Sequence, residues 1–384
     1  MIESFLSFEF TTAARIFFRE GACRELPSLA AAMGSRALVV TGSNPQRAME
    51  YCHPRQDIDW HFYPIQGGEP TVDAVLSGVE AGRSHDCDLV IGFGGGGAVD
   101  AGKAIAALLA NQGDIFDYLE VIGKAQPLLR PPLPNIAVPT TAGTGAEVTR
   151  NAVIKSSTHQ VKVSLRSPLM LPKLALVDPA LTISMPPEVT ASTGLDALTQ
   201  LIEAYTTRNA NPITDALCET GIRAAASSLL RAWSNGTDRE AREKMSLASL
   251  LSGLVIANAG LGAVHGFAAP IGGLFEAPHG IVCAALLPAV FEANIKATGD
   301  GPASRRFAHI GALLTGTPNA DAWQALQWIR QTCETLQVPT LGKLGISSRN
   351  IPLIVEKARK ASSMKGNPVA LDDKTLAEIL RRSI

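Results

Sequence analysis

The feature that most constrains the fold of this chain is a run of four glycines between a strand pattern and a helix pattern. Residues 92–103 read GFGGGGAVDAGK. Residues 88–93 have the short apolar composition of a buried strand, and residues 100–110 have the composition of a helix. Backbone N–H groups in such a turn, with the helix N-terminus, favour an anion. We therefore expect the run to bind the phosphates of a nucleotide, the alternative being a plain flexible turn.

The spacing of the run excludes two common nucleotide-binding patterns. It does not match GxGxxG, and Lys103 is followed by Ala104 where the pattern GxxxxGK[ST] needs a hydroxyl for magnesium. A second glycine-containing loop, residues 139–147 (PTTAGTGAE), offers threonine hydroxyls and N–H groups that suit a carboxamide or a phosphate. Taken alone, this second loop is equally typical of a simple turn.

Around these loops, strand and helix patterns alternate in the first half of the chain. The alternation, with strands expected at 36–41, 88–93, 136–139 and 174–177, is typical of a parallel sheet covered by helices. After residue 185, apolar periodicity predicts helices at 188–206, 213–232, 239–257, 303–314, 320–335 and 372–382. A chain of 384 residues exceeds one ordinary core. We predict an α/β dinucleotide-binding domain over 1–185 and an all-helical metal and substrate domain over 186–384.

Composition narrows the class of protein. The net charge of −1, with scattered basic residues, argues against a nucleic-acid partner. The apolar stretches are short or interrupted, so no membrane span is expected, and residues 1–10 lack the basic start of a secretory signal. The six cysteines form no CxxC pair, which favours reduced thiols over a disulfide framework or a metal cluster. We expect a cytoplasmic protein.

The end of the first long strand bears on the choice of cofactor. A carboxylate there would hydrogen-bond a ribose hydroxyl and repel a 2′-phosphate. Here the strand ends in TGSN, with Ser43 and Asn44 as candidate cofactor contacts and Arg47 nearby. NADP is therefore permitted, and the missing carboxylate could favour it over NAD. The alternative is that Ser43 and Asn44 only close a turn and Arg47 lies on the surface.

A set of metal-binding residue types lies further along the chain. Asp196 and Gln200 are four residues apart and share one helix face, and Glu203 lies on a similar face. His265 and His279 lie in an apolar, glycine-rich stretch where an imidazole needs a partner. One aspartate with two histidines suits a divalent metal with open positions for substrate. The alternative is two core histidines that bond to backbone carbonyls.

Taken together, these segments resemble the iron-containing (group III) alcohol dehydrogenase family. The matching motifs follow one another over nearly the whole chain: GGGGAVDAGKAIA at 94–106, PTTAGTGAEVT at 139–149, LVDPALT at 176–182, STGLDALTQLIEAY at 192–205 and GLGAVHGFAAPIGGLFEAPHG at 260–280. The resemblance implies the dehydroquinate synthase-like architecture, with an α/β N-terminal domain, an all-α C-terminal domain and an active site between them. It also implies a homodimer or a larger homo-oligomer.

The resemblance also assigns site residues by position. The pyrophosphate would be held by Gly95, Gly96 and Gly97, with Asp100 in the same turn. Further cofactor contacts would come from Thr140, Thr141, Thr144, Lys162 and Leu181, and the metal ligands would be Asp196, His265 and His279.

Several positions depart from the family pattern. Gly97 and Ala146 stand where relatives often carry serine. Gln200 stands where the second helix ligand is commonly histidine, and Ala269 replaces a further histidine that is often given a proton-transfer role. A glutamine oxygen is a weaker ligand than imidazole. Either the site binds iron or zinc through three strong ligands, as related glycerol dehydrogenases do with zinc, with Gln200 as a candidate fourth, or it binds metal poorly.

The resemblance implies reversible hydride transfer between the nicotinamide and a carbinol carbon, with a metal that polarises the substrate oxygen. We expect Gln200 to hydrogen-bond that oxygen if it does not bind metal. Because Ala269 replaces the usual histidine, we expect the proton to leave through Thr144 and water. The residues Phe267, Leu274 and Phe275 suggest a partly apolar pocket for a small alcohol or aldehyde, unless they belong to the core.

Three other functions stay open at this point. A maleylacetate reductase-like enzyme would reduce a keto acid and would use Arg150, Lys162 and Arg166 as cationic contacts. A catalytically impaired chain would bind a dinucleotide without turnover, as the two missing histidines suggest. A dehydroquinate synthase-like lyase shares the architecture, but the intact PTTAGTGAE loop argues against it.

Overall fold

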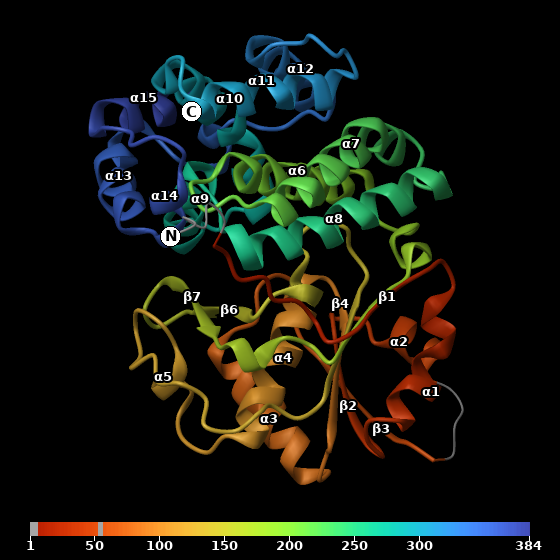
Figure 1. Ribbon diagram of the computed structural model, residues 1–384. Coiled ribbons are helices and arrows are strands. Elements are labelled where there is room, and N and C mark those ends of the chain that lie inside the picture. The colour runs from red at the N-terminus through yellow and green to blue at the C-terminus, as the bar shows by residue number, and fades with distance from the viewer. Residues whose placement is uncertain (1–6, 53–56) are drawn as a thin grey trace, which may run out of the picture.

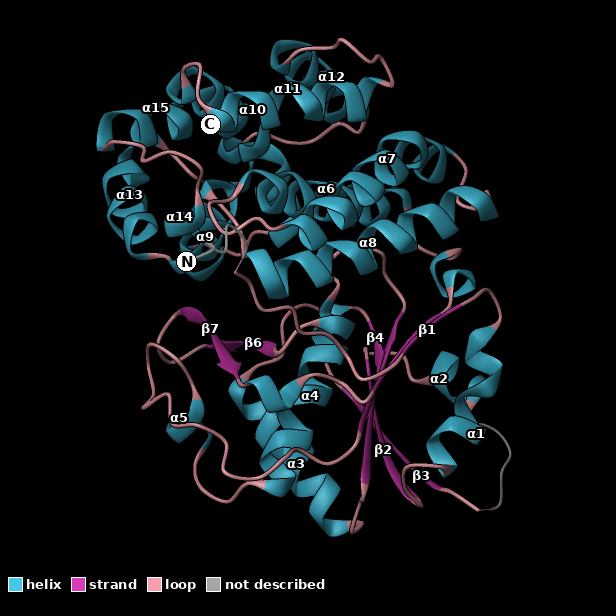
Figure 2. Ribbon diagram, viewed as in Figure 1, coloured by secondary structure: helices cyan, strands magenta, loops and turns pink. Residues whose placement is uncertain are grey.

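The computed structural model describes residues 7–52 and 57–384, so most of the N-terminal segment 1–10 lies outside the described residues. The described chain forms a sheet-containing half and a helical half that lie one above the other (Figure 1). The last strand of the sheet ends at Val177, and the first long helix of the helical half begins at Pro187. All described strands lie in the first half, where helices pack against the sheet, whereas the second half contains helices without strands (Figure 2). The fold is therefore α/β followed by all-α.

The first half is built on a six-stranded sheet whose neighbouring strands are all parallel. Its spatial order is β1 (Ile16–Phe18), β8 (Leu174–Val177), β5 (Asn135–Pro139), β4 (Leu89–Gly94), β2 (Arg36–Thr41) and β3 (Asp59–Pro64). The central strands β4 and β5 are buried along their whole length. Such near-continuous apolar strands are expected where helices cover both faces of a parallel sheet.

Side chains along each strand point alternately to the two faces of the sheet, so the apolar core has two layers. On β2, Leu38 and Val40 pack with α3 (Val72–Ser84) and α4 (Gly96–Ala110). The intervening residues Ala37 and Val39 pack on the opposite face with α1 (Leu26–Ala31). Successive strand side chains point to opposite faces, so each face receives its own apolar row. The short helices α2 (Gln46–Tyr51) and α5 (Ile115–Tyr118) and the antiparallel hairpin β6 (Asn151–Ser156) and β7 (Val161–Arg166) complete this half.

The strand order reverses between β2 and β4. From β2 the chain runs outward to β3, and it then returns to the other side of β2 to form β4, β5 and β8. Ligands of open parallel sheets bind beyond the carboxyl ends of the strands at such a reversal. The two strand ends meet there, because a Cβ at Gly94 would lie 3.3 Å from the backbone nitrogen of Gly42. The topology thus places the glycine run at the expected binding position.

The second half is a helical domain around α6 (Pro187–Thr206), which is buried over most of its length. The surrounding helices are α7 (Pro212–Ser234), α8 (Arg239–Ala259), α9 (Ala263–Leu274), α10 (His279–Thr298), α11 (Pro302–Thr315), α12 (Ala322–Thr335), α13 (Ile351–Lys360), α14 (Ser362–Gly366) and α15 (Asp373–Ser383). A helix buried on nearly all sides must pair its polar residues. The buried polar residues of α6 must therefore have polar or charged partners, and those partners indicate where a functional site lies.

By length and composition, α10 would be long and apolar enough to cross a membrane, and so would α8 and α9 together if they formed one bent span. In the structure α10 packs against α6, α9, α12 and α15, and 56% of its apolar window is buried inside the protein. Core helices of water-soluble domains have the same composition. The apolar character of α10 is thus accounted for by its place in the helical core.

The elements predicted from the sequence are present, with boundary shifts of a few residues. The clearest difference concerns residues 260–280, which form α9 and the start of α10 despite Gly266, Gly272, Gly273 and Pro270. Helix propensity disfavours these residues, but burial of the apolar side chains on both helices outweighs it. The strands β1 and β3 and the β6–β7 hairpin were also not predicted.

Candidate metal and cofactor site

The glycine run forms the turn from β4 into α4. Gly94 ends the strand, Gly95 is the helix N-cap and α4 begins at Gly96. The loop after β5 lies against this turn, because a Cβ at Gly96 would be 2.8 Å from Thr144 Oγ1, and a Cβ at Gly95 would be 3.6 Å from Thr141 Oγ1. Thr140 donates its backbone N–H to the Gly94 carbonyl at 2.8 Å. The structure thus brings the two loops together at an open helix N-terminus, which suits a phosphate.

Gly97 is required here for space rather than for backbone conformation. A Cβ at Gly97 would lie 1.9 Å from the carbonyl oxygen of Gly68, far inside a van der Waals contact. The segment from Gly68 to Glu69 therefore passes directly over the first turn of α4. Glu69 in turn forms an ion pair with Lys162 of β7, in which Oε1 and Nζ are 2.5 Å apart. The serine that relatives often carry at position 97 does not fit beside this segment.

Asp100 lies one turn further along α4 and faces the interior rather than the loop surface. Its Oδ1 is 2.9 Å from Lys103 Nζ, and its Oδ2 accepts the Val153 N–H of β6 at 3.0 Å. Lys103 is fully buried and also donates to the Ala146 carbonyl at 2.9 Å and to Thr149 Oγ1 at 3.0 Å. The pair ties α4 to the hairpin and to the second loop. Asp100 therefore helps to position the cofactor loops through its contacts with Lys103 and Val153, in the interior of the domain.

The remaining predicted cofactor residues have varied surroundings. Ser43 and Asn44 are exposed, and Asn44 Oδ1 accepts the Gln46 N–H at 2.9 Å, as in a turn. Arg47 is not free at the surface, since its guanidinium donates to the carbonyl oxygen of Leu181. The Leu181 side chain is fully buried in the sheet core.

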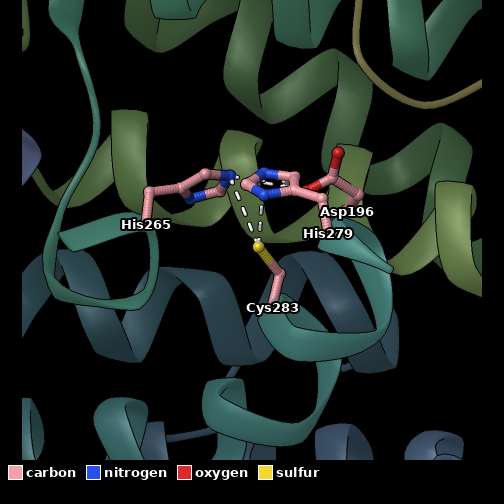
Figure 3. Close-up of side chains that lie close together, drawn as sticks. All are labelled: Asp196, His265, His279 and Cys283. Carbon is pink, nitrogen blue, oxygen red and sulfur yellow. Dashed lines mark hydrogen bonds and ion pairs between the residues drawn. The ribbon is translucent and has the colours of Figure 1, made fainter. Parts of the chain in front are cut away.

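A cluster of metal-binding side chains lies in the helical domain. Asp196 comes from α6, His265 from α9, and His279 and Cys283 from successive turns of α10. Their ligand atoms all lie within 4.8 Å of one another, and in Figure 3 the four side chains point toward a common centre. Within the described chain this is the one group of three or more histidine, cysteine, aspartate or glutamate side chains spaced for a metal.

One carboxylate oxygen of Asp196 accepts a hydrogen bond, and the other does not. Its Oδ2 accepts a 2.9 Å hydrogen bond from Gln200 Nε2. Its Oδ1 is buried and receives no hydrogen bond from any described residue, although it lies 3.4 Å from His265 Nε2 and 3.8 Å from His279 Nε2. A buried carboxylate oxygen without a partner is costly. A divalent cation between these donors would satisfy it, so the residues present fit a metal.

Glu203 fixes the orientation of His265. Its Oε2 lies 2.6 Å from His265 Nδ1, and its Oε1 accepts the Val264 N–H at 2.6 Å. A carboxylate at Nδ1 requires a proton on that nitrogen, so Nε2 is left to face the cluster. Glu203 is thus a positioning residue for a metal-binding imidazole, which the shared helix face of Asp196 and Glu203 had only suggested.

Gln200 does not direct a donor atom at the cluster. A carboxylate only accepts hydrogen bonds, so the Gln200 NH2 group must face Asp196. Its Oε1 then points away and lies 2.7 Å from the Ser252 hydroxyl of α8. The structure therefore gives Gln200 the role of holding Asp196 in place, whereas the sequence offered it as a fourth metal ligand or as a hydrogen-bond partner of the substrate oxygen.

The electrostatics of the cluster favour positive charge. Cys283 and then Asp196 raise the pKa of His279 to about 9, against an opposing effect of burial. Burial lowers the pKa of His265, but Cys283, Asp196 and Glu203 outweigh it, so this pKa is raised well above 6.5. Burial raises the pKa of Asp196, and the two imidazoles lower it below its ordinary value. The cluster is therefore suited to a cation.

The cluster is connected to the second cofactor loop through α8. Ser252 Oγ lies 2.7 Å from Gln200 Oε1 and 3.4 Å from the carbonyl oxygen of Gly143. Next to it, the backbones of Gly145 and Gly253 touch, because a Cβ on Gly253 would lie 2.2 Å from the Gly145 carbonyl oxygen. Gly145 also has a φ of +59°, which glycine adopts without strain. The metal cluster and the nicotinamide-side loop are therefore held at a fixed spacing.

Cys283 is the site residue that the sequence analysis missed. Its spacing to His279, four residues on one helix, is the signal that would have found it. Thr144, the predicted proton carrier, is exposed, and its Oγ1 accepts the Ala146 N–H at 3.3 Å. Phe267, a predicted pocket residue, is fully buried in the helical core, whereas Leu274 is 36% exposed at the end of α9.

A glycine turn at the reversal of a parallel sheet and a buried histidine–carboxylate cluster in the helical domain together suit an enzyme that uses a dinucleotide and a divalent metal. Comparison with known proteins identifies the family. Residues 13–179 match the model of the iron-containing alcohol dehydrogenases, and residues 190–384 match the model of the C-terminal domain of that family. The chain belongs to the iron-containing alcohol dehydrogenase family.

Individual relatives agree with this assignment. The chain is 37% identical over 315 residues to the 1,3-propanediol dehydrogenase of Citrobacter freundii, covering 80% of this chain and 79% of the relative. It is 32% identical over 378 residues to alcohol dehydrogenase 4 of Saccharomyces cerevisiae, covering 96% of each chain. The crystal structure of a 1,3-propanediol oxidoreductase superposes with a TM-score of 0.89 at 32% identity, covering 99% of this chain and 100% of that chain.

These relatives also settle the reaction class. The chain is an alcohol dehydrogenase, an oxidoreductase that interconverts alcohols and aldehydes with NAD. The same comparisons do not favour the keto-acid reductase or the non-catalytic dinucleotide-binding protein considered from the sequence. A sulfoacetaldehyde reductase from Bifidobacterium kashiwanohense, solved in complex with NAD+, also shares the fold, with a TM-score of 0.88 at 27% identity over 98% of this chain and 99% of that chain.

Proposed function

We propose that this alcohol dehydrogenase is metal-assisted, with residues 1–185 binding the dinucleotide and residues 186–384 holding the metal and the substrate oxygen. The observation that carries the proposal is the buried Oδ1 of Asp196, which accepts no hydrogen bond from the described residues and lies within 3.8 Å of the Nε2 atoms of His265 and His279. When bound, a divalent metal supplies Lewis-acid polarisation of the substrate oxygen. The three side chains hold the metal, and Glu203 and Gln200 keep two of them oriented.

The chain's own residues place the cofactor next to this centre. Backbone N–H groups at Gly95, Gly96 and Gly97 would bind the pyrophosphate, with Thr141 and Thr144 beside them. Thr140 completes the loop edge through its bond to Gly94. The contact of Gly145 with Gly253 fixes how close this loop comes to the helical domain. Hydride transfer depends on such fixed spacing, because reacting atoms must approach to about 3–3.5 Å.

NAD is the cofactor that the strand end supports best. A 2′-phosphate would need a free cation beyond β2, where Arg47 is the nearest basic residue on the chain. The Arg47 guanidinium is already bonded to the Leu181 carbonyl. Ser43 and Asn44 are exposed at the same place and offer hydroxyl and amide groups to a ribose. We therefore expect a lower KM for NADH than for NADPH.

Small aliphatic alcohols and their aldehydes are the proposed substrates. Two of the relatives are named for the dehydrogenation or oxidoreduction of 1,3-propanediol. Leu274 and Phe275, at the C-terminal end of the helix that carries His265, are partly exposed. Ala269, on the same helix, is exposed and has no imidazole to move a proton, so Thr144 with water stays the predicted proton route.

A cytoplasmic location and a homo-oligomeric state are proposed from the family resemblance. All six cysteines are free, which agrees with a reducing compartment.

The decisive experiment crosses NADH and NADPH with short aldehydes, ketones and keto acids, using chelator-treated protein with and without added iron or zinc. We expect NADH-dependent reduction of short aldehydes that requires added metal. Equal rates without metal would contradict metal assistance, and exclusive activity on keto acids would contradict the substrate class. His279→Ala serves as the matched variant and should lose at least 100-fold in kcat while it keeps NADH binding.

A further inference from the structure

The donor set around Asp196 contains one residue more than the proposed function uses. Cys283 is completely buried, and its Sγ lies 3.7 Å from both His265 Nε2 and His279 Nε2. We propose that the Cys283 thiolate is the fourth protein ligand of the metal, in place of the histidine that Gln200 replaces. The proposal rests on the metal-assisted function above and names a ligand that the family pattern does not provide.

The distances between the donor atoms support this assignment. With metal–nitrogen and metal–oxygen bonds of about 2.0–2.1 Å and a metal–sulfur bond of about 2.3 Å, tetrahedral donors lie about 3.3–3.6 Å apart. In the structure Asp196 Oδ1 lies 3.4 Å and 3.8 Å from the two imidazole nitrogens, and Cys283 Sγ lies 3.7 Å from each. These four donor–donor distances are close to the separation that one metal ion would impose, and all the donor atoms lie within 4.8 Å of one another.

The position of Cys283 on α10 explains how it reaches the cluster. It follows His279 by four residues, so both side chains lie on the same face of the helix, one turn apart. In Figure 3 the Sγ atom points up from α10 toward the imidazoles. The other cysteines offer a contrast. Cys333 also packs against α10, but its Sγ faces the backbone carbonyl of Ala284.

The orientation of Gln200 makes the fourth position available to sulfur. Its NH2 group faces Asp196, and its oxygen lies 2.7 Å from Ser252 Oγ, so neither group is directed into the cluster. A histidine at position 200 would bring a neutral donor from α6. Cys283 instead brings an anionic donor from α10, because a thiol that binds a metal loses its proton. A centre with one carboxylate, one thiolate and two neutral imidazoles then balances the two positive charges of the metal, and the substrate oxygen would be its fifth ligand.

The first test uses the unmodified protein loaded with Zn2+. X-ray absorption at the zinc edge should show one sulfur at about 2.3 Å among nitrogen and oxygen neighbours. A shell of nitrogen and oxygen alone would overturn the role of Cys283 and leave metal assistance intact. Failure of the protein to bind either zinc or iron would overturn both proposals. The two failures are therefore distinguishable without any activity measurement.

The second test compares variants loaded with Co2+, whose thiolate complexes absorb in the near ultraviolet. We expect this band in the wild type and in the matched control Cys333→Ser, and we expect it to be absent from Cys283→Ser. Chelator competition should show Zn2+ affinity at least 10-fold weaker for Cys283→Ser than for Cys333→Ser. An unchanged band or unchanged affinity in Cys283→Ser would refute the assignment. The zinc-edge measurement on the wild type decides the matter if Cys283→Ser does not fold.

Discussion

Replacing Lys103 by methionine tests whether the buried ion pair between Asp100 and Lys103 holds the two cofactor loops in place. The Lys103 side chain is fully buried, with its Nζ 2.9 Å from Asp100 Oδ1 and 2.9 Å from the Ala146 carbonyl. Methionine has a similar length but leaves the Asp100 carboxylate in the interior with only the Val153 N–H as a partner. Removing one member of a buried pair costs about 3–5 kcal/mol. We expect a loss of that size in the free energy of unfolding.

The assay is urea unfolding at pH 8, followed by far-ultraviolet circular dichroism and repeated with saturating NADH. Lys124→Met is the control, because Lys124 forms a 2.7 Å ion pair with Asp117 while 69% exposed, and exposed pairs contribute at most about 1 kcal/mol. Burial raises the pKa of Asp100, and Lys103 only partly offsets this. Without Lys103 the carboxyl takes up a proton more readily, so the loss should be smaller at pH 5 than at pH 8.

The double variant Asp100→Asn/Lys103→Met separates the charge effect from lost packing. It should recover part of the stability that Lys103→Met loses, because no unpaired buried charge remains. A loss below about 1 kcal/mol in Lys103→Met, equal to that of Lys124→Met, would refute the reasoning.

Three further predictions concern other residues of the site. Burial raises the pKa of Glu147 from 4.5 to about 7, so its charging removes stability as the pH rises through that range. Glu147→Gln should then be more stable than the wild type at pH 8 by about 3 kcal/mol, at about 1.36 kcal/mol per pH unit, and parallel pH profiles of urea unfolding would contradict this. Gly97→Ser should weaken NADH binding at least 10-fold in fluorescence titrations, because its Cβ would meet the Gly68 carbonyl oxygen at 1.9 Å; unchanged affinity would show that this segment yields easily. Glu203→Gln should weaken Zn2+ binding by about 10–100-fold in chelator competition, because His265 loses its anionic partner, and wild-type affinity would argue against that role.

The sequence was sufficient for the parts of the fold whose signals are local. The strand 88–93, the glycine run and the following helix are contiguous, so their composition predicted β4, the turn and α4 directly. The hairpin β6–β7 was missed although its burial alternates, because its strands are only six residues long and contain polar residues such as Lys155 and Lys162. The hairpin packs against α4 and α9. Tertiary burial decides such elements more than propensity does.

In the candidate site, too, some residues could be predicted from the sequence, whereas others depend on tertiary contacts. Asp196, His265 and His279 were predicted to act together, and the structure does bring them to one centre. The role of Cys283 depends on α10, which begins at His279 and was not among the helices predicted from the sequence. The orientation of Gln200 depends on Ser252, which is 52 residues away on α8. Long-range hydrogen bonds of this kind leave no periodic trace in a sequence.

The backbone contact between Gly145 and Gly253 has a consequence for the precision of the reaction. Contacts between side chains can change length by switching rotamers, whereas two touching main chains have no such freedom. The contact lies between the loop expected to carry the hydride donor and the helix that supports Gln200 and Asp196. It therefore works as a rigid spacer between the two reacting partners. A misplacement of about 1 Å can cost 100-fold in rate, so a single methyl group at this spacer would act on turnover without touching substrate, cofactor or metal.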